Sequence, residues 1–145
     1  MKKTRPKQSQ AQASATCRSV QELRDALLAL HKTLIESERS VYEANVGPIQ
    51  SPHHFLQLLS TDPWFAWLRP VSQLIVAIDE ALDTKKTLTS NDSQALKNES
   101  IFLLDPAKGG GEFEERYRAA LQRDPQVILA HAKVVKRIAV GEPQN

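Results

Sequence analysis

Four histidines and one cysteine are the side chains of this 145-residue chain best suited to metal binding, proton transfer or nucleophilic attack near neutral pH. His53 and His54 are neighbours, so they cannot both face one point on a helix. His31 and His131 stand in opposite halves of the chain, and no His-Glu-x-x-His or cysteine cluster places two ligands on one helical face. A weak metal or ligand site is therefore expected only if His31 and His131 meet across helices.

His131 and Cys17 each have a simple structural explanation. His131 falls within an apolar helical stripe, where a histidine is usually a core residue with one hydrogen-bonded nitrogen; an acid–base role is the alternative. Cys17 lies beside the N-terminal tail, away from any helix terminus that would lower the pKa of its thiol. No Gly-x-Ser-x-Gly motif is present. We expect no covalent nucleophile and no cofactor.

Three polar residues of the first predicted helix, Arg24, His31 and Glu38, are spaced by seven and lie along one edge of its apolar stripe. The arginine and histidine resemble the signature of the small helical HEPN ribonucleases, in which the two residues are separated by four to six positions. The resemblance implies RNA cleavage by Arg24 and His31. In that family the motif lies late in the domain, whereas here it opens the first helix. The structural alternative is the charged border of an amphipathic helix.

Aromatic residues gather at Trp64, Phe65 and Trp67, just after Asp62-Pro63. At helical spacing Phe65 points away from the stripe that the two tryptophans share. The cluster is therefore either an exposed patch that binds a partner or a plug at the end of the bundle. The string Trp-Phe-x-Trp-Leu-x-Pro before an apolar helix resembles an uncharacterised family of small all-α bacterial proteins. That resemblance implies a helical fold and carries no activity.

The net charge of +2 is unevenly distributed along the chain. Residues 1–15 contain Lys2, Lys3, Arg5 and Lys7 and no acid, so the remainder sums to −2. This segment is too polar to form a core, and we expect a disordered tail over residues 1–17 that makes weak, non-specific contacts with nucleic-acid phosphates. Neither a signal-peptide apolar stretch nor a run of ~18 apolar residues is present, which favours a cytoplasmic protein without membrane contact.

Caps and prolines predict a succession of helices and no strand. A capping box, Ser19-Val20-Gln21-Glu22, is expected to start the first helix, which continues to Gly47-Pro48 with Val41 on its apolar stripe. Later helices are predicted over residues 53–60, 62–83 with a kink at Pro70, 90–104 with Ile101 on the apolar face, 112–123 and 125–138 with Val135 on the apolar face.

These elements predict an all-α, compact bundle of about four main helices and one or two short ones. The folded domain should span residues 18–141, between the basic tail and a short C-terminal tail over residues 142–145. The predicted function is a non-catalytic macromolecular interaction module that binds an unidentified protein or itself. The HEPN-like ribonuclease and the histidine metal or ligand site are the alternatives.

Overall fold

A computed structural model describes the backbone of residues 7–84, 87–105, 107 and 110–139, and the side chains of these residues from residue 14 onward. The all-α prediction is confirmed, and no strand occurs in these ranges. In chain order the elements are α1 (Lys7–Asn45), α2 (Pro52–Thr61), the 3₁₀ helix η1 (Pro63–Leu68), α3 (Arg69–Thr84), α4 (Ser90–Leu104), α5 (Glu112–Arg123) and α6 (Pro125–Ala139). The four long helices α1, α3, α4 and α6 form the bundle, as predicted.

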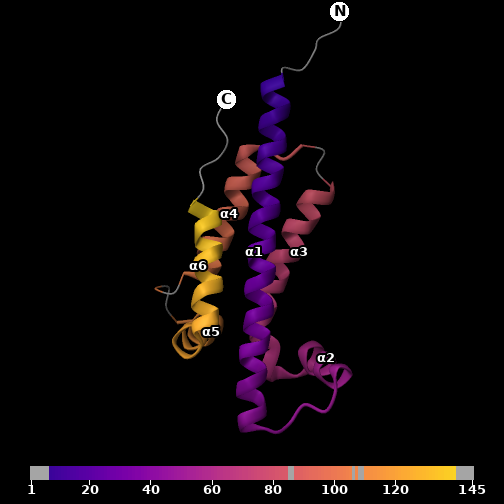
Figure 1. Cartoon of the computed structure of the whole chain (residues 1–145), viewed down its shortest axis with the longest axis vertical. Helices are drawn as coiled ribbons and strands as arrows, with labels where there is room; N and C mark the ends of the chain where they lie inside the picture. Colours follow the sequence, from indigo (N-terminus) through magenta and orange to yellow (C-terminus); the bar gives the residue numbers. More distant parts are fainter. Residues whose placement is uncertain (1–6, 85–86, 106, 108–109, 140–145) are drawn as a thin grey trace, which may run out of the picture.

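Helix α1 is the central element against which the other long helices pack. It runs the full height of the bundle in Figure 1, with α3 on one side and α4 and α6 on the other. One stripe of α1 is almost completely buried: Thr16, Val20, Leu23, Leu27, Leu30 and Leu34. These residues recur every three or four positions, so they face the same direction and supply one wall of the core.

The predicted start of α1 at Ser19 is wrong, because the helix begins at Lys7. Alanine and glutamine, which fill this stretch, are favourable in helices. Thr16, which is 1% exposed, lies one turn before Val20 and extends the buried stripe. Residues 7–17 of the predicted tail therefore belong to α1, whereas residues 1–6 lie outside the described residues.

Near the other end of α1, the apolar stripe shifts by one residue relative to the predicted one. Tyr42 is buried there, and Val41, which the sequence placed on the stripe, is only half-buried. The shift follows from the 3.6-residue helical period, which drifts against a fixed spacing over many turns. Tyr42 thereby reaches the aromatic side chains of η1.

The predicted helix over residues 62–83 is divided into two parts. The carboxylate of Asp62 accepts a hydrogen bond from the Trp64 amide (2.8 Å) and caps η1. An α-helix through this segment would need an amide proton at Pro70, which has none, and the proline ring would crowd the carbonyl of Ala66. The tighter 3₁₀ turns of η1 precede the proline, and α3 begins at Arg69. The predicted break is confirmed, one residue before Pro70.

Of the two predicted arrangements of the aromatic cluster, the plug is confirmed and the exposed patch is wrong. Phe65 is 2% exposed, Trp67 is buried, and Trp64 is half-buried. The Phe65 ring lies 5.4 Å from that of Tyr42 and 5.8 Å from that of Phe55, measured between centroids. The α-helical spacing misplaced Phe65, because η1 has three residues per turn and α2 covers it through Phe55.

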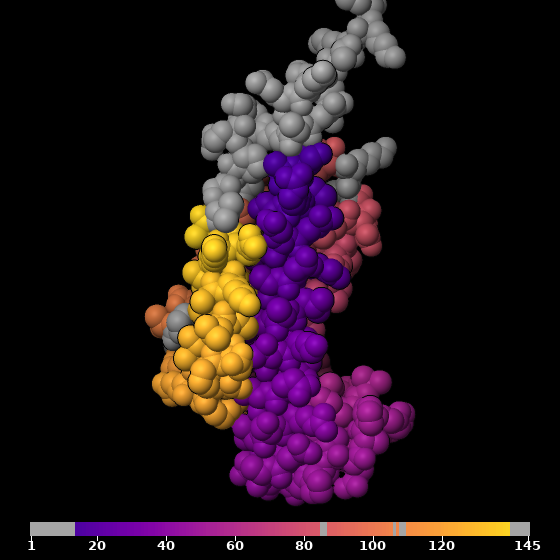
Figure 2. All heavy atoms as spheres, in the orientation of Figure 1, coloured from indigo at the N-terminus to yellow at the C-terminus, as the bar shows by residue number. Residues whose placement is uncertain are grey.

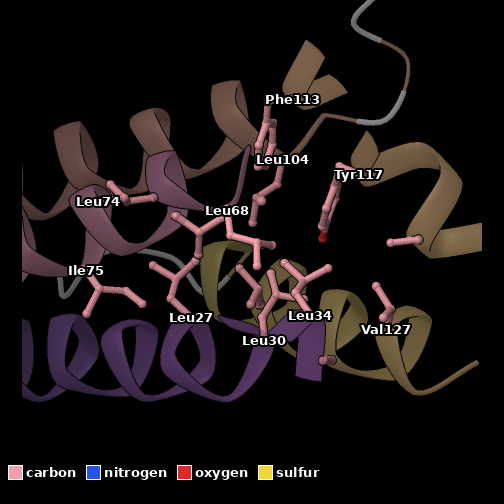
Figure 3. Close-up of a cluster of buried hydrophobic side chains, with 14 of the residues drawn as sticks. Leu27, Leu30, Leu34, Leu68, Leu74, Ile75, Leu104, Phe113, Tyr117 and Val127 are labelled. Atoms are coloured by element: carbon pink, nitrogen blue, oxygen red, sulfur yellow. The ribbon is translucent and has the colours of Figure 1, made fainter. Parts of the chain in front are cut away.

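Figure 3 shows how the core is closed between α1 and the opposite helices. Leu27, Leu30 and Leu34 of α1 face Leu68 of η1 and residues of α3. Beyond them lies an aromatic stack, in which Phe113 and Tyr117 are parallel with centroids 5.5 Å apart. The short helix α5 therefore closes one side of the core by its aromatic face, and its bounds are those predicted.

Helix α4 has an unusual distribution of polarity. Its buried residues include Ser93, Lys97 and Ser100, whereas Ile101 and Phe102 are 47% and 67% exposed. The predicted core position of Ile101 is therefore wrong. Hydroxyl groups can be buried here because they satisfy themselves locally: the Ser100 hydroxyl donates to the carbonyl four residues earlier (2.9 Å). The buried face of α4 therefore mixes these polar residues with Leu96 and Leu104, while Ile101 and Phe102 face outward.

If Phe65 plugs the bundle, truncating it should be costly. We expect Phe65→Ala to lower the free energy of unfolding by about 3–4 kcal/mol, because it removes a buried ring and leaves a cavity. Leu56→Ala is the matched control at the same end, since Leu56 is 61% exposed, and should change stability by less than about 0.5 kcal/mol. Urea unfolding measures both. Similar losses for the two variants would contradict the plug.

Candidate functional site

An open, mainly apolar groove of about 510 Å³ lies between α4 and α6. The two helices run in opposite directions, α4 towards α5 and α6 away from it (Figure 1). The groove is lined by Ile101, Leu104 and Asp105 from the end of α4 and by His131, Val135, Ile138 and Ala139 from α6. Its polar groups are the Asp105 carboxylate and the His131 ring.

Beside the groove, an apolar stripe on α6 faces outward. Ile128 and Val135 are 50% and 46% exposed, and Ala132 and Ala139 are exposed as well. These four residues, here called the α6 stripe, are spaced by four, three and four, so they lie on one side of the helix. Figure 2 shows α6 at the surface beside α1. The α6 stripe is therefore an exposed apolar surface that borders the groove.

The prediction that Val135 belongs to the core is wrong. The buried residues of α6 are Val127, Ala130 and Val134, and Ile138 is half-buried. The predicted apolar face of α6 is therefore rotated by about one residue relative to the buried face. The sequence signal at Ala130 is weak, because alanine is less apolar than valine. The core-facing arc of α6 points towards α1, which leaves Val135 on the side of α4.

His131 is held by a tyrosine of α5. The Tyr117 hydroxyl and His131 Nδ1 are 2.6 Å apart, and Tyr117 is 1% exposed. Burial lowers the pKa of His131 and raises the pKa of Tyr117. At neutral pH the phenol therefore donates to Nδ1, and the imidazole carries its proton on Nε2. The predicted single hydrogen-bonded nitrogen is confirmed, although the ring is half-buried and borders the groove.

His31 lies in a different hollow, of about 140 Å³, between α1, α2, η1 and α3. Its lining shares no residue with the α4–α6 groove, so the structure does not bring His31 and His131 to one site. Among the described residues, no three histidine, cysteine, aspartate or glutamate side chains are grouped so that they would hold a metal ion.

Arg24 belongs to a third, polar hollow, which also includes Cys17. Its Nε atom is 2.7 Å from Asp79 of α3, and its Nη1 atom is 3.3 Å from Asp25. The hydrogen bond and the charge of Asp79 raise the pKa of Arg24. Arg24 and His31, the HEPN-like pair, therefore line separate hollows.

Glu38, the third of the residues spaced by seven on α1, pairs with Arg123 of α5. It is 3% exposed, and its carboxylate lies 3.4 Å from the guanidinium of Arg123, the last residue of α5. The same guanidinium donates to the Ser37 hydroxyl (3.0 Å). The polar edge of α1 thus contacts α3 through Arg24 and α5 through Glu38, which matches the structural interpretation of an amphipathic border.

The structure does not describe the basic side chains of the predicted tail. Lys2, Lys3 and Arg5 lie outside the described residues, and Lys7 begins α1 without a described side chain. Contact of this segment with nucleic acid stays a prediction.

Sequence reasoning missed the α4 side of the groove and the tyrosine that holds His131. The sequence predicts a helix that ends at residue 104 with Ile101 in the core, and it assigns no role to Asp105. A partial signal was present: Ile101 and Phe102 fall outside the face that Leu96 and Leu104 share with Ser93, Lys97 and Ser100. Apolar residues on two sides of a helix indicate a second contact surface.

No protein-family model matches the chain, and no curated protein or solved structure is significantly similar to it. We therefore infer the function from the geometry of this chain's own residues. Within its described residues, no helix combines the length and the apolar content that a bilayer crossing requires.

The half-buried imidazoles of His31 and His131 should make the free energy of unfolding depend on pH. His131 has a pKa below its unfolded value of 6.5, so its contribution to stability is complete above pH 6.5 and is lost as the pH falls through 6.5 towards the folded pKa. We expect His131→Gln to reduce the fall in unfolding free energy between pH 7.5 and 5. His31, whose pKa burial also lowers, supplies part of the remaining dependence.

The matched control is His53→Gln, since His53 is exposed at the start of α2. Urea unfolding at a series of pH values gives the slope for each variant. Parallel curves for the wild type and His131→Gln would contradict the assigned role of His131.

Proposed function

We propose that the protein is a non-catalytic interaction module that receives an amphipathic helix of a partner protein in the α4–α6 groove. The observation that carries this proposal is the exposure of apolar side chains on both helices at the groove: Ile101 of α4 is 47% exposed and Val135 of α6 is 46% exposed. Exposed apolar residues that gather at a concave surface are typical of protein interaction sites.

The shape of the groove supports a helical occupant. Two antiparallel helices leave a trough between them, and Ile101 and Val135 stand on its opposite walls. An amphipathic helix laid in such a trough places residues at i, i+3, i+4 and i+7 against the walls. Leu104 and Ile138 add to the apolar lining of the groove.

The charges at the edges indicate which kind of helix fits. Lys133 and Lys136 are exposed on the outer side of α6, beyond the α6 stripe. Acidic residues along one flank of the partner helix would meet this basic edge. A second copy of α6 would instead bring another basic edge to the contact and no acidic flank to complement it. The partner is therefore an acidic amphipathic helix of another protein.

Two observations favour binding over RNA cleavage. Arg24 and His31 line separate hollows, and Asp79 holds the Arg24 guanidinium in an ion pair. A general acid or base and its electrostatic partner must reach the same reacting group.

We place the module in the cytoplasm, where the free thiol of Cys17 would stay reduced.

The proposal is tested with a synthetic acidic helix of about four turns, carrying leucine at i, i+4, i+7 and i+11 and glutamate along one flank. We expect saturable binding to the full chain by fluorescence anisotropy. Val135→Glu should weaken it by about tenfold or more, because an unpaired carboxylate at the apolar contact costs well above 1.4 kcal/mol.

Val76→Glu is the matched control, because Val76 is 53% exposed on α3, away from the groove. It should leave the affinity unchanged. Equal affinities for the wild type and Val135→Glu would contradict the proposal. A concentration-dependent dimer that Val135→Glu separates, seen by light scattering, would show that a second copy occupies the groove.

A further inference from the structure

A second hollow has the features of a small-molecule site. It lies at the opposite side of α1 from the groove, where four elements meet, and has a volume of about 140 Å³. Its lining consists of His31 and Ile35 of α1, Leu59 of α2, Phe65 and Leu68 of η1, and Arg69 and Ser72 of α3. Apolar side chains supply most of the wall, with three polar residues beside them.

Two of these polar residues have hydrogen-bonding groups to offer. Within the part of the chain that the structure describes, no hydrogen bond or ion pair involves the Arg69 guanidinium or the His31 ring nitrogens, although His31 is half-buried. The Ser72 hydroxyl donates to the Arg69 carbonyl (2.9 Å), so it can only accept from a ligand. The hollow thus combines one permanent cation with one imidazole beside an apolar wall.

The Arg69 side chain is exposed, and the backbone sets the point at which it leaves the chain beside the hollow. Arg69 is the first residue of α3 and the C-cap of η1, and its amide donates to the Ala66 carbonyl. The break that Pro70 imposes therefore sets the direction in which Arg69 leaves the helix. Phe65, three residues into η1, is held in the aromatic plug and forms part of the apolar wall.

We propose that this hollow binds a small monocarboxylate with a compact apolar body. The apolar body would contact Leu59, Phe65 and Leu68, and the carboxylate would accept paired hydrogen bonds from the planar guanidinium of Arg69. His31 would donate a further hydrogen bond from a ring N–H. Burial lowers the pKa of His31, which keeps the imidazole neutral and one nitrogen protonated at neutral pH.

Size and charge select this class of ligand. A cavity of about 150 Å³ accommodates a molecule such as benzene, so the body is limited to a single ring or a short branched chain. One guanidinium balances one negative charge. A phosphate dianion would leave excess charge against the apolar wall. A neutral ligand would lack the paired, charge-assisted hydrogen bonds with Arg69. This site is independent of the partner-helix proposal, because the two linings share no residue.

The experiment titrates benzoate into the full chain by isothermal calorimetry, with benzyl alcohol and inorganic phosphate as comparison probes. We expect saturable benzoate binding with a dissociation constant of about 1 mM, and at least about tenfold weaker binding of the other two probes. Arg69→Gln should weaken benzoate by about tenfold or more and leave benzyl alcohol unchanged. The matched control, Arg18→Gln, removes an exposed arginine of α1 and should have no effect.

A second variant tests the apolar wall separately from the charge. Leu59→Phe should fill the hollow and weaken both benzoate and benzyl alcohol, with helical content by circular dichroism unchanged. Absence of saturable benzoate binding to the wild type would overturn the proposal, as would an Arg69→Gln variant with wild-type benzoate affinity. Phosphate binding as tight as that of benzoate would show a general anion site and would also overturn it.

Discussion

The buried stripe of α1 is the constraint on which the rest of the structure depends. Six positions from Thr16 to Leu34 face one way without interruption, so α3, α4 and α6 each turn their packing face towards the same helix. Contacts between the outer helices are secondary to this arrangement. The groove between α4 and α6 follows from it: α6 directs Val127 and Val134 into the core, and Ile101 and Val135 remain outside.

Local signals predicted most helix boundaries. Asp62-Pro63 begins an element as expected, and α2 begins at Pro52, one residue before its predicted start, because a capping side chain and a proline act within one turn of backbone. The start of α1 was not predicted correctly. The Ser19 capping box is a local signal, whereas the stabilisation from the buried stripe of α1 depends on helices that are distant in the sequence. Phe65 was misplaced for a related reason, since its cover comes from α2 and its direction from a 3₁₀ turn.

The candidate sites were less predictable than the helices. The sequence indicated that His131 would have one hydrogen-bonded nitrogen, and the partner, Tyr117, lies on the preceding helix. It could not indicate which hollow each polar residue would line. Arg24 and His31 share an edge of α1. Arg24 nevertheless pairs with Asp79 of α3, whereas His31 lines a separate hollow between α1, α2, η1 and α3. Such sorting depends on where neighbouring helices end, which no local spacing encodes.

The central claim is that the groove between α4 and α6 is the surface that receives a partner helix. Amide chemical shifts of the full, isotope-labelled chain, followed while the acidic amphipathic peptide is added, test it most directly. We expect the changes to concentrate on residues 101–105 of α4 and residues 131–139 of α6, which line or border the groove. Changes centred on α2 and α3, around Leu56 and Val76, would contradict it.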